Sequence, residues 1–223
     1  MITRYTILLF IAAVIGLVSC KNNDEVFKTV LNANVNVINA SADTLNFYLN
    51  GTRQNNTSSL YPTSFSYYLP VPSGQQNYQF KKAGGFTDLF SVPLNLKVST
   101  YNSLYITGGT SGQAFSTIDT LQKDSSLVLV RFVNASPDAG NLTVSIGDTV
   151  YFPARTFKTS SKFLPVGSGI KTVKIYQAGT TNLLIDTAIT MLPNDSYTLF
   201  SKGLLKGKGN SMFDVGVVLN VSN

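Results

Sequence analysis

The sequence carries one short phrase twice at a fixed distance. "INASAD" occupies residues 38–43 and "VNASPD" residues 133–138, so each letter follows its partner by 95 positions. The same offset relates "LPV" at 69–71 to 164–166, "SG" at 73–74 to 168–169, and "AG" at 83–84 to 178–179. Chance matches do not share one register, so the chain is predicted to be a tandem duplication of a unit of about 95 residues. A unit of that size can bury its own core.

Between the repeated phrases the pattern is that of β-strands. Segments 45–49 ("LNFYL") and 142–146 ("LTVSI") alternate with period two, while 35–39 and 127–134 are apolar and rich in β-branched residues. Further strands are expected at 77–80, 103–107, 172–176, 197–201 and 213–222. No segment beyond the N-terminal run keeps a 3.6-residue period, and Pro and Gly separate the strands. We therefore expect an all-β chain made of two tandem immunoglobulin-like antiparallel β-sandwiches.

The N-terminus has the features of a bacterial lipoprotein signal. Arg4 precedes an uncharged, mostly apolar run too short to span a membrane, and "LVSC" then resembles a lipobox ending at Cys20. The resemblance implies a diacylglycerol on the Cys20 thiol after cleavage. The alternative is a cleaved secretory signal with a chance cysteine.

These features divide the chain into four predicted segments. A signal peptide covers 1–19 and a lipidated tether covers 20–30. The first sandwich is expected at 31–122 and the second at 123–223, with the boundary in the polar "QKDSS" at 122–126. The predicted location is the outer membrane, lipid-anchored, and the acidic "KNNDE" after Cys20 resembles a surface-export signal. A flexible polar tether explains "KNNDE" equally well.

Composition removes several classes of chemistry. The chain has no His, so it cannot use a Ser-His or Cys-His nucleophile or an imidazole zinc site. No cofactor or metal is expected, and nothing approaches an EF-hand spacing for calcium. The net charge is +6, and the basic stretch 201–210 ("SKGLLKGKGN") reads as an exposed loop without aromatic residues for base stacking. Nucleic acid is therefore not an expected partner.

The repeated phrase itself is expected to form a turn. A strand ends before Asn134, Pro137 restricts φ, and Asn134 and Ser136 can bond nearby backbone amides. Ala42 replaces the proline in the first copy. The alternative is a ligand site built from Asn, Ser and Asp.

At this point the chain resembles a known family. "VRFVNASPDAGNLTVSI", residues 130–146, is similar to the signature of the Domain of Unknown Function 4397 family, a strand followed by an Ala-Ser-Pro-Asp turn and a second strand. The first copy matches less closely because its proline is lost. The resemblance implies immunoglobulin-like modules on bacterial lipoproteins and secreted proteins, and it carries over no catalytic residue.

One aromatic segment is a candidate ligand contact. "LYPTSFSYYLP" contains Tyr61, Phe65, Tyr67 and Tyr68. A period-two reading places Phe65 and Tyr67 on one face and Tyr68 on the other, so the segment could stack on a glycan. The alternative is a core face opposite ordinary surface tyrosines.

A second candidate feature is the sequence Asp-Thr followed by an apolar residue. It occurs four times and resembles an O-glycosylation acceptor. The predicted carriers are Thr44, Thr120, Thr149 and Thr187. The alternative is that Asp-Thr simply borders strands.

The function predicted from these features is non-catalytic. We expect an envelope lipoprotein whose sandwiches bind a protein or glycan partner or serve a structural role. The alternatives are a hydrolase using two carboxylates about 5 to 9 Å apart and an accessory subunit of a surface uptake or adhesion complex. "SGIK" at 168–171 matches a Ser-x-x-Lys motif, but it lies in a predicted turn before a strand rather than on a helix.

Overall fold

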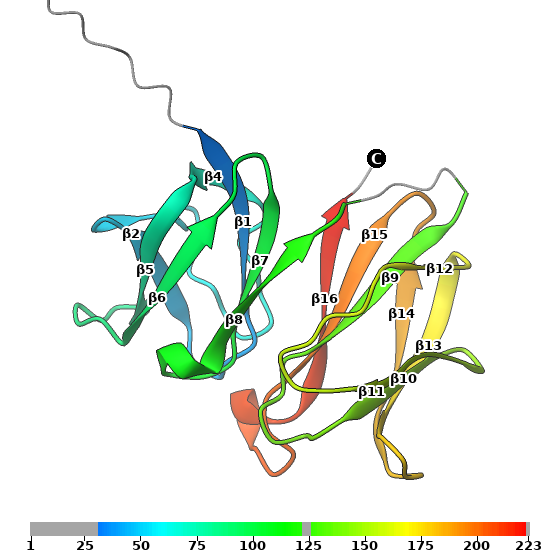
Figure 1. Ribbon diagram of the computed structural model, residues 1–223. Helices are drawn as coiled ribbons and strands as arrows, with labels where there is room; N and C mark the ends of the chain where they lie inside the picture. The colour runs from blue at the N-terminus through cyan, green and yellow to red at the C-terminus, as the bar shows by residue number, and fades with distance from the viewer. Residues whose placement is uncertain (1–30, 122–125, 222–223) are drawn as a thin grey trace, which may run out of the picture. The chain divides into compact units, whose positions relative to one another are not determined.

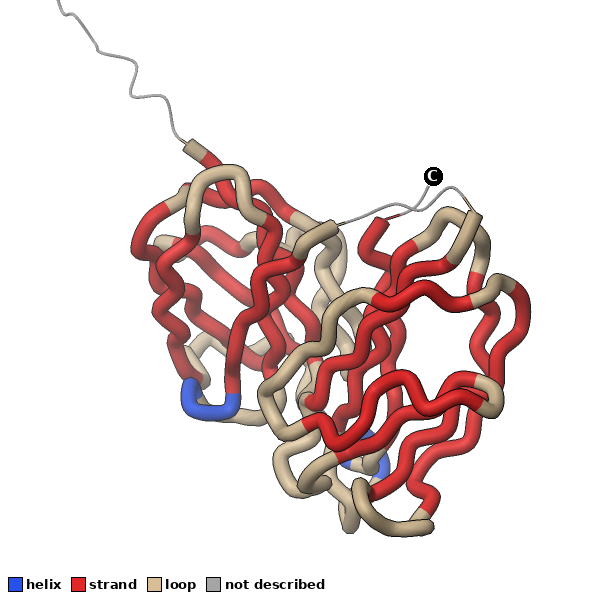
Figure 2. The backbone as a smooth tube through the Cα atoms, turned by 45° about the vertical axis from the view of Figure 1, so that its right-hand side comes forward, coloured by secondary structure: helices blue, strands red, loops and turns tan. Residues whose placement is uncertain are grey.

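The computed structural model describes residues 31–121 and 126–221. Within them the chain forms sixteen β-strands and two short 3₁₀ turns, η1 (Ser111–Gln113) and η2 (Gly209–Ser211), and no α-helix. The strands group into four sheets of four. Figures 1 and 2 show strands throughout the described chain, and the all-β prediction is confirmed.

The first sandwich contains two sheets. One has the order β4 (Leu69–Pro72), β1 (Asn32–Asn39), β7 (Tyr101–Ile106) and β8 (Ala114–Asp119). The other has the order β3 (Thr52–Arg53), β2 (Leu45–Leu49), β5 (Gly74–Lys82) and β6 (Phe90–Leu96). The chain switches between the two sheets, which brings the residues on either side of each crossover onto opposite walls of one core.

The second sandwich repeats this topology strand for strand. Its sheets have the orders β12 (Leu164–Val166), β9 (Val128–Asn134), β15 (Ser196–Lys202), β16 (Asp214–Val221) and β11 (Thr149–Arg155), β10 (Leu142–Ile146), β13 (Gly169–Gln177), β14 (Leu183–Met191). Both bounds of β13 lie 95 residues after those of β5. The duplication read from the sequence is therefore a duplication of the fold.

Each sandwich contains one parallel strand pair, which the antiparallel expectation did not include. β1 pairs with β7 and β9 with β15 in the parallel sense, and every other strand pair is antiparallel. The register is the same in both copies, with Val37 opposite Leu104 and Phe132 opposite Leu199. Parallel strands need a long connection, and here the whole of the other sheet lies between them in sequence.

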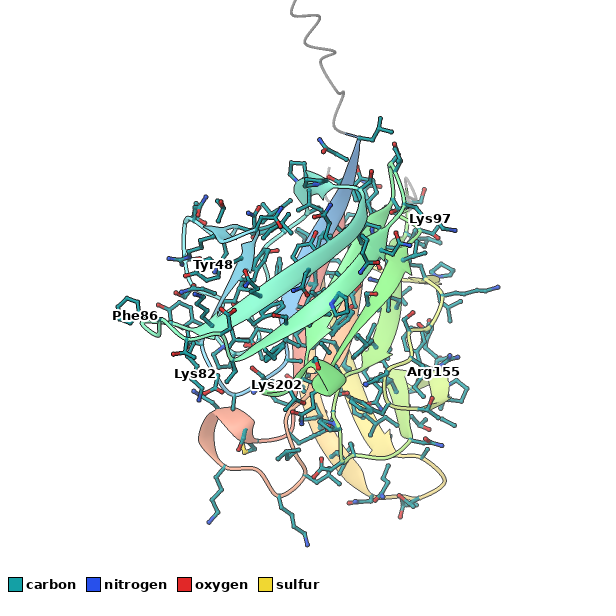
Figure 3. All side chains as sticks on the ribbon, turned by 60° about the vertical axis from the view of Figure 1, so that its left-hand side comes forward. Tyr48, Lys82, Phe86, Lys97, Arg155 and Lys202 are labelled. Atoms are coloured by element: carbon teal, nitrogen blue, oxygen red, sulfur yellow. The ribbon has the colours of Figure 1, made fainter. Side chains whose placement is uncertain are left out.

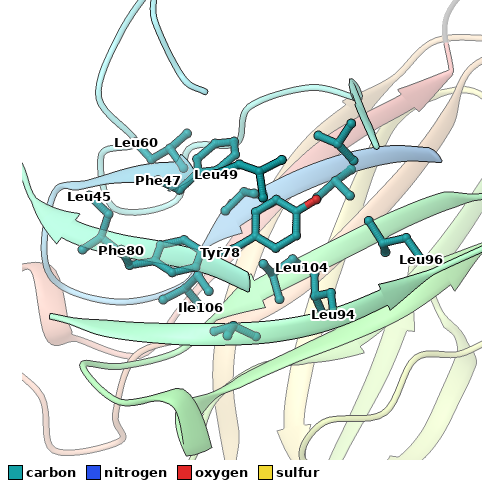
Figure 4. Close-up of a cluster of buried hydrophobic side chains, with 14 of the residues drawn as sticks. Leu45, Phe47, Leu49, Leu60, Tyr78, Phe80, Leu94, Leu96, Leu104 and Ile106 are labelled. Carbon is teal, nitrogen blue, oxygen red and sulfur yellow. The ribbon is translucent and has the colours of Figure 1, made fainter. Parts of the chain in front are cut away.

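Each sandwich has its own apolar core. Phe47 and Phe80 stack in the first core with ring centroids 6.1 Å apart, beside the fully buried Tyr78. Figure 4 shows these side chains between the two sheets of that sandwich. In the second core Phe132 and Phe152 stack at 6.3 Å, and Val173 occupies the position equivalent to Tyr78.

A third apolar cluster lies between the sheet containing β1 and the sheet containing β9. We call these two sheets the facing sheets. Its rings include Tyr105, which lies 5.0 Å from Phe115 and 6.2 Å from Phe200. The other members are Ile38, Ala40, Phe65, Val133, Ala135 and Val218. All seven residues of β9 and all seven of β15 are buried, because one face of each strand enters its own core and the other meets the opposite sandwich. This explains why 127–134 reads as a continuous apolar run rather than an alternating one.

Several predictions fall outside the described residues. These are the signal peptide, the tether, Cys20 and most of the boundary at 122–126. The expected loop at 201–210 is correct only in part, because Ser201 and Lys202 are buried at the end of β15 and the exposed loop begins at Leu204. In the described part of the chain, no helix has the length and apolar character needed to cross a membrane.

Candidate functional site

The repeated asparagine is a structural brace. The Asn39 side chain is fully buried, and its Nδ2 donates to the carbonyl oxygens of Asp43 (2.7 Å) and Leu60 (2.8 Å). Its Oδ1 accepts from the backbone N–H of Ser41 at 3.0 Å and from the Ser41 hydroxyl at 2.7 Å. All the hydrogen-bonding capacity of the amide is thus used inside the fold.

Asn134 makes a similar set of four bonds with two changes of partner. Nδ2 donates to the carbonyl oxygens of Gly140 (2.8 Å) and Arg155 (2.9 Å), and Oδ1 accepts from the Ser136 N–H at 3.2 Å and the Ser201 hydroxyl at 3.0 Å. The Ser136 hydroxyl donates instead to the carbonyl of Gly203 at 2.6 Å. The turn interpretation holds for the asparagines, each of which is sealed from solvent and accepts the N–H two residues further on, whereas the Ser136 hydroxyl bonds a distant carbonyl rather than the nearby amide expected.

A buried carboxylate lies between the facing sheets. Asp119 is fully buried and forms an ion pair with Arg131 at 2.6 Å between Oδ1 and Nη1. Its Oδ2 accepts hydrogen bonds from the hydroxyls of Ser103 (2.5 Å) and Tyr68 (2.6 Å). Burial, and then the negative charge of Asp119, raise the pKa of the Tyr68 hydroxyl, which therefore remains a donor.

The network continues into the second sandwich. Arg131 Nε donates to the Thr198 hydroxyl at 2.8 Å, which donates to Asn220 Oδ1 at 2.5 Å. Asn220 Nδ2 donates back to the Tyr68 oxygen at 3.0 Å. Burial alone would lower the pKa of Arg131, but Tyr105 and Asp119 outweigh it and raise that pKa, so the guanidinium is charged. Its Nη2 is buried and has no hydrogen-bond partner among the described residues.

The aromatic segment 61–68 is irregular rather than a strand, so the period-two premise is wrong. Thr63 and Tyr67 have φ values of 71° and 59°, in the left-handed region. The rings of Phe65 and Tyr67 do lie together, with centroids 4.8 Å apart in an edge-to-face arrangement. Tyr67 is 65 % exposed, and Tyr61 is 61 % exposed. Tyr68 instead points to Asp119 and belongs to the interface between the sandwiches.

A hollow of about 180 Å³ lies beside Phe65 and Tyr67. The rest of its wall is polar and uncharged apart from two leucines: Gln54, Asn55, Asn56, Thr57, Ser58, Leu60, Ser66 and Leu69. Exposed rings next to amides and hydroxyls are groups that can contact a neutral polar ligand through both stacking and hydrogen bonds. We call Tyr61, Phe65, Tyr67 and this hollow the aromatic corner.

The second copy of the corner has a different chemistry. At the same offset of 95, Phe65 becomes Ser160, Tyr67 becomes Lys162 and Tyr68 becomes Phe163. The serine between them is unchanged in role, because Ser66 Oγ accepts the Val37 N–H and Ser161 Oγ accepts the Phe132 N–H, both at 2.9 Å.

A cavity of about 440 Å³ opens at this second corner. Its wall consists of Ile118, Thr120, Arg131, Ser160, Ser161, Lys162 and Phe163. The Phe163 ring covers the guanidinium, with its centroid 4.9 Å from Arg131 Cζ. No feature of the sequence marked this cavity, because residues far apart in the chain build it.

The described carboxylates are scattered and mostly paired. Asp43 and Asp88 form exposed ion pairs with Lys82 (2.9 Å) and Lys81 (3.4 Å). Asp138 accepts from the N–H of Leu205, and Asp195 accepts from the Tyr197 hydroxyl. No group of three metal-binding side chains occurs in the described segments.

The four threonine candidates lie in different settings. Thr120 directly follows β8, Thr149 begins β11, and Thr44 precedes β2, so these three border strands. Thr187 lies inside β14, opposite Val173, where the border explanation is wrong. Glycosylation of these residues stays a prediction.

The most exposed aromatic side chain among the described residues is one that the sequence reading did not select. Phe86 is 93 % exposed at the tip of the β5–β6 hairpin, where Figure 3 shows it pointing away from the sheet near Lys82. One isolated ring of this kind does not define a site.

Comparison with known proteins identifies a family and gives little beyond it. No curated protein matches the chain. A solved structure titled as alpha-glucan recognition by family 41 carbohydrate-binding modules from streptococcal virulence factors aligns with 13 % identity, covering 75 % of this chain and 92 % of that one, at a TM-score of 0.27. The family described as "Domain of unknown function (DUF4397)" matches residues 33–145 and 128–215. These two matches span most of both sandwiches, and the chain belongs to the DUF4397 family as a tandem pair of its domains.

Proposed function

We propose that the protein is a non-catalytic binding protein of the bacterial envelope, held at the outer membrane by a lipid on Cys20. The observation that carries the binding role is the aromatic corner. A bulky residue in the left-handed region is uncommon and costs free energy. At Tyr67 that conformation holds a ring out to solvent beside Phe65 and above a hollow lined by amides and hydroxyls.

The ligand class proposed for this corner is a neutral glycan. No charged side chain of the described residues lines the hollow, and the exposed faces of Tyr61 and Tyr67 offer stacking surfaces for sugar rings. A protein partner on the same corner, as in an adhesion or uptake complex, is the competing possibility.

Titration calorimetry against a panel of soluble neutral oligosaccharides tests this proposal. Tyr67→Gly keeps the backbone conformation accessible while removing the ring, and we expect it to weaken binding by about tenfold. Phe86→Ala is the matched control, because it removes an even more exposed ring elsewhere on the same sandwich. Equal binding by the wild type and Tyr67→Gly would reject the corner as the glycan site.

The membrane anchor is tested separately. Cys20→Ser should release the protein from the membrane fraction and remove the lipid from its intact mass. Protease shaving of intact cells decides whether the protein faces outward, and the same mass measurement reveals sugars on Thr44, Thr120, Thr149 or Thr187. A native protein whose mass matches the unlipidated, unglycosylated chain would refute both modifications.

The hydrolase alternative has less support. It needs two carboxylates that flank one cleft. Neither of the two cavities described above is lined by two acids of the described chain, and the acids that do have partners are engaged in ion pairs or hydrogen bonds.

A further inference from the structure

We propose that the cavity at the second corner binds a carboxylate carried on a sugar ring, a hexuronate unit. This inference deepens the proposed binding function, but it concerns a different cavity and a different ligand chemistry from the aromatic corner. It does not depend on the lipid anchor.

The charge of the cavity favours an anion. Lys162 and Arg131 both line it, and no carboxylate among the described residues does. Asp119 balances one positive charge through its ion pair with Arg131, so Lys162 leaves the wall with an excess positive charge. Lys162 is exposed, and its ammonium group can swing toward a ligand at low cost.

Arg131, one of the residues that line the cavity, has a buried donor without an acceptor in the described chain. The Arg131 side chain is 3 % exposed, its Nη1 is bound to Asp119 and its Nε to Thr198. Nη2 alone has no partner in the described chain. An unpaired buried donor on a charged group is costly, and a ligand oxygen would satisfy it. The half-buried Phe163 ring lies over the guanidinium and must turn aside for that contact.

The size and remaining walls favour a ring rather than a bare ion. The cavity volume of about 440 Å³ is far larger than an inorganic anion needs. Ile118 and Phe163 supply apolar surfaces for the face of a sugar ring, while the hydroxyls of Ser160 and Thr120 can bond its hydroxyl groups. Ser161 is already engaged, because its hydroxyl donates to the Lys162 carbonyl at 2.8 Å.

The contrast with the first corner supports the assignment. Position 36, which corresponds to Arg131 in the repeat, is a buried asparagine, and position 67 is a tyrosine where the second copy has Lys162. Both cationic groups therefore occur only in the second copy of the motif. The duplication supplies the scaffold twice, and the charge distinguishes the two cavities.

Calorimetry or NMR titration of the full mature chain with glucuronate, glucose, acetate and sulfate tests the proposal. We expect glucuronate to bind with a Kd of about 10 mM or below, and glucose to bind at least tenfold more weakly. Lys162→Ala should weaken glucuronate binding by about tenfold. Lys206→Ala is the matched control, because Lys206 is exposed in the same sandwich and does not line the cavity.

Two further results decide the details. Phe163→Ala uncovers the guanidinium, so we expect it to bind acetate several-fold more tightly than the wild type does. Unchanged acetate binding in Phe163→Ala would overturn the role of Arg131 Nη2. Sulfate binding as tight as glucuronate would overturn the sugar-acid assignment in favour of a general anion site.

Failure of this proposal is distinguishable from failure of the proposed function. If Lys162→Ala loses glucuronate binding while Tyr67→Gly binds glucuronate as the wild type does, glucuronate binding is assigned to this cavity alone. Absence of glucuronate binding by the wild type would overturn the inference and leave the neutral-glycan test at the aromatic corner intact.

Discussion

The two sandwiches share a fold but differ at equivalent positions in their facing sheets. Arg131 of β9 lies in a network of ionic and hydrogen-bonding partners. Asn36 of β1, its counterpart 95 residues earlier, is buried, and neither polar atom of its side chain has a hydrogen-bond partner within the described chain. The polar side chains near the ends of the outer strands also differ, since β8 carries the Asp119 carboxylate, which pairs with Arg131, and β16 carries the neutral Asn220 amide, which bonds Thr198 and Tyr68. A duplication fixes the backbone in both copies, but it leaves each polar position free to become a partner for the other sandwich.

The largest expected loss of stability comes from breaking the ion pair between Arg131 and Asp119. Arg131→Met leaves the Asp119 carboxylate buried without its cation, so we expect a loss of about 3–5 kcal/mol in the free energy of unfolding. Asn36→Val should raise the free energy of unfolding or leave it unchanged, because it removes two buried polar groups that lack partners in the described chain. Chemical denaturation measures both.

A double variant sharpens this result. Arg131→Met combined with Asp119→Leu should recover a large part of the stability lost by Arg131→Met alone, since no charge remains buried. If the double variant instead lost the sum of the two single losses, the side chains would stabilise the protein by more than compensating each other's buried charge.

The next effect concerns the two braces at Asn39 and Asn134. Replacing either by Ala removes four hydrogen bonds from a sealed site, and we expect each variant to lose about 2–4 kcal/mol. Serine variants should distinguish the two copies. Ser136→Ala leaves the carbonyl of Gly203, far away in sequence, without its donor, whereas Ser41→Ala removes a bond only within its own turn. Equal losses in the two serine variants would contradict this difference.

The smallest effect appears only at alkaline pH and lies in the first core. Burial raises the pKa of Tyr78 to about 12, whereas its pKa in the unfolded chain is about 10. Below pH 10 the hydroxyl is neutral in both states, so its ionisation does not change the free energy of unfolding. Between pH 10 and 12 the unfolded state loses the proton first, so stability falls by about 2–3 kcal/mol over that window.

Tyr78→Phe should reduce this alkaline loss. The hydroxyl has no hydrogen-bond partner in the described chain, so its removal should not destabilise the protein at neutral pH. Melting temperatures measured from pH 8 to 12 for the wild type and Tyr78→Phe test the comparison. An identical pH profile would assign the alkaline sensitivity to other buried tyrosines, such as Tyr105, whose pKa burial also raises.

The sequence alone determined the duplication, the all-β class and most of the central strands. A repeat at a fixed offset and a two-residue alternation of apolar and polar residues are visible directly in the amino-acid sequence. It also determined that the repeated asparagines build a turn, because their bonds reach mainly residues close by in the chain.

Only the tertiary structure decided the parallel pairing of β1 with β7, the facing of the two sheets and the two corner cavities. Asp119 and Arg131 lie on the strands β8 and β9 of different sandwiches, and Tyr68 meets Asn220 across 152 residues. Strand partners and contacts between sandwiches depend on how two finished surfaces fit together, and no local periodicity encodes that fit.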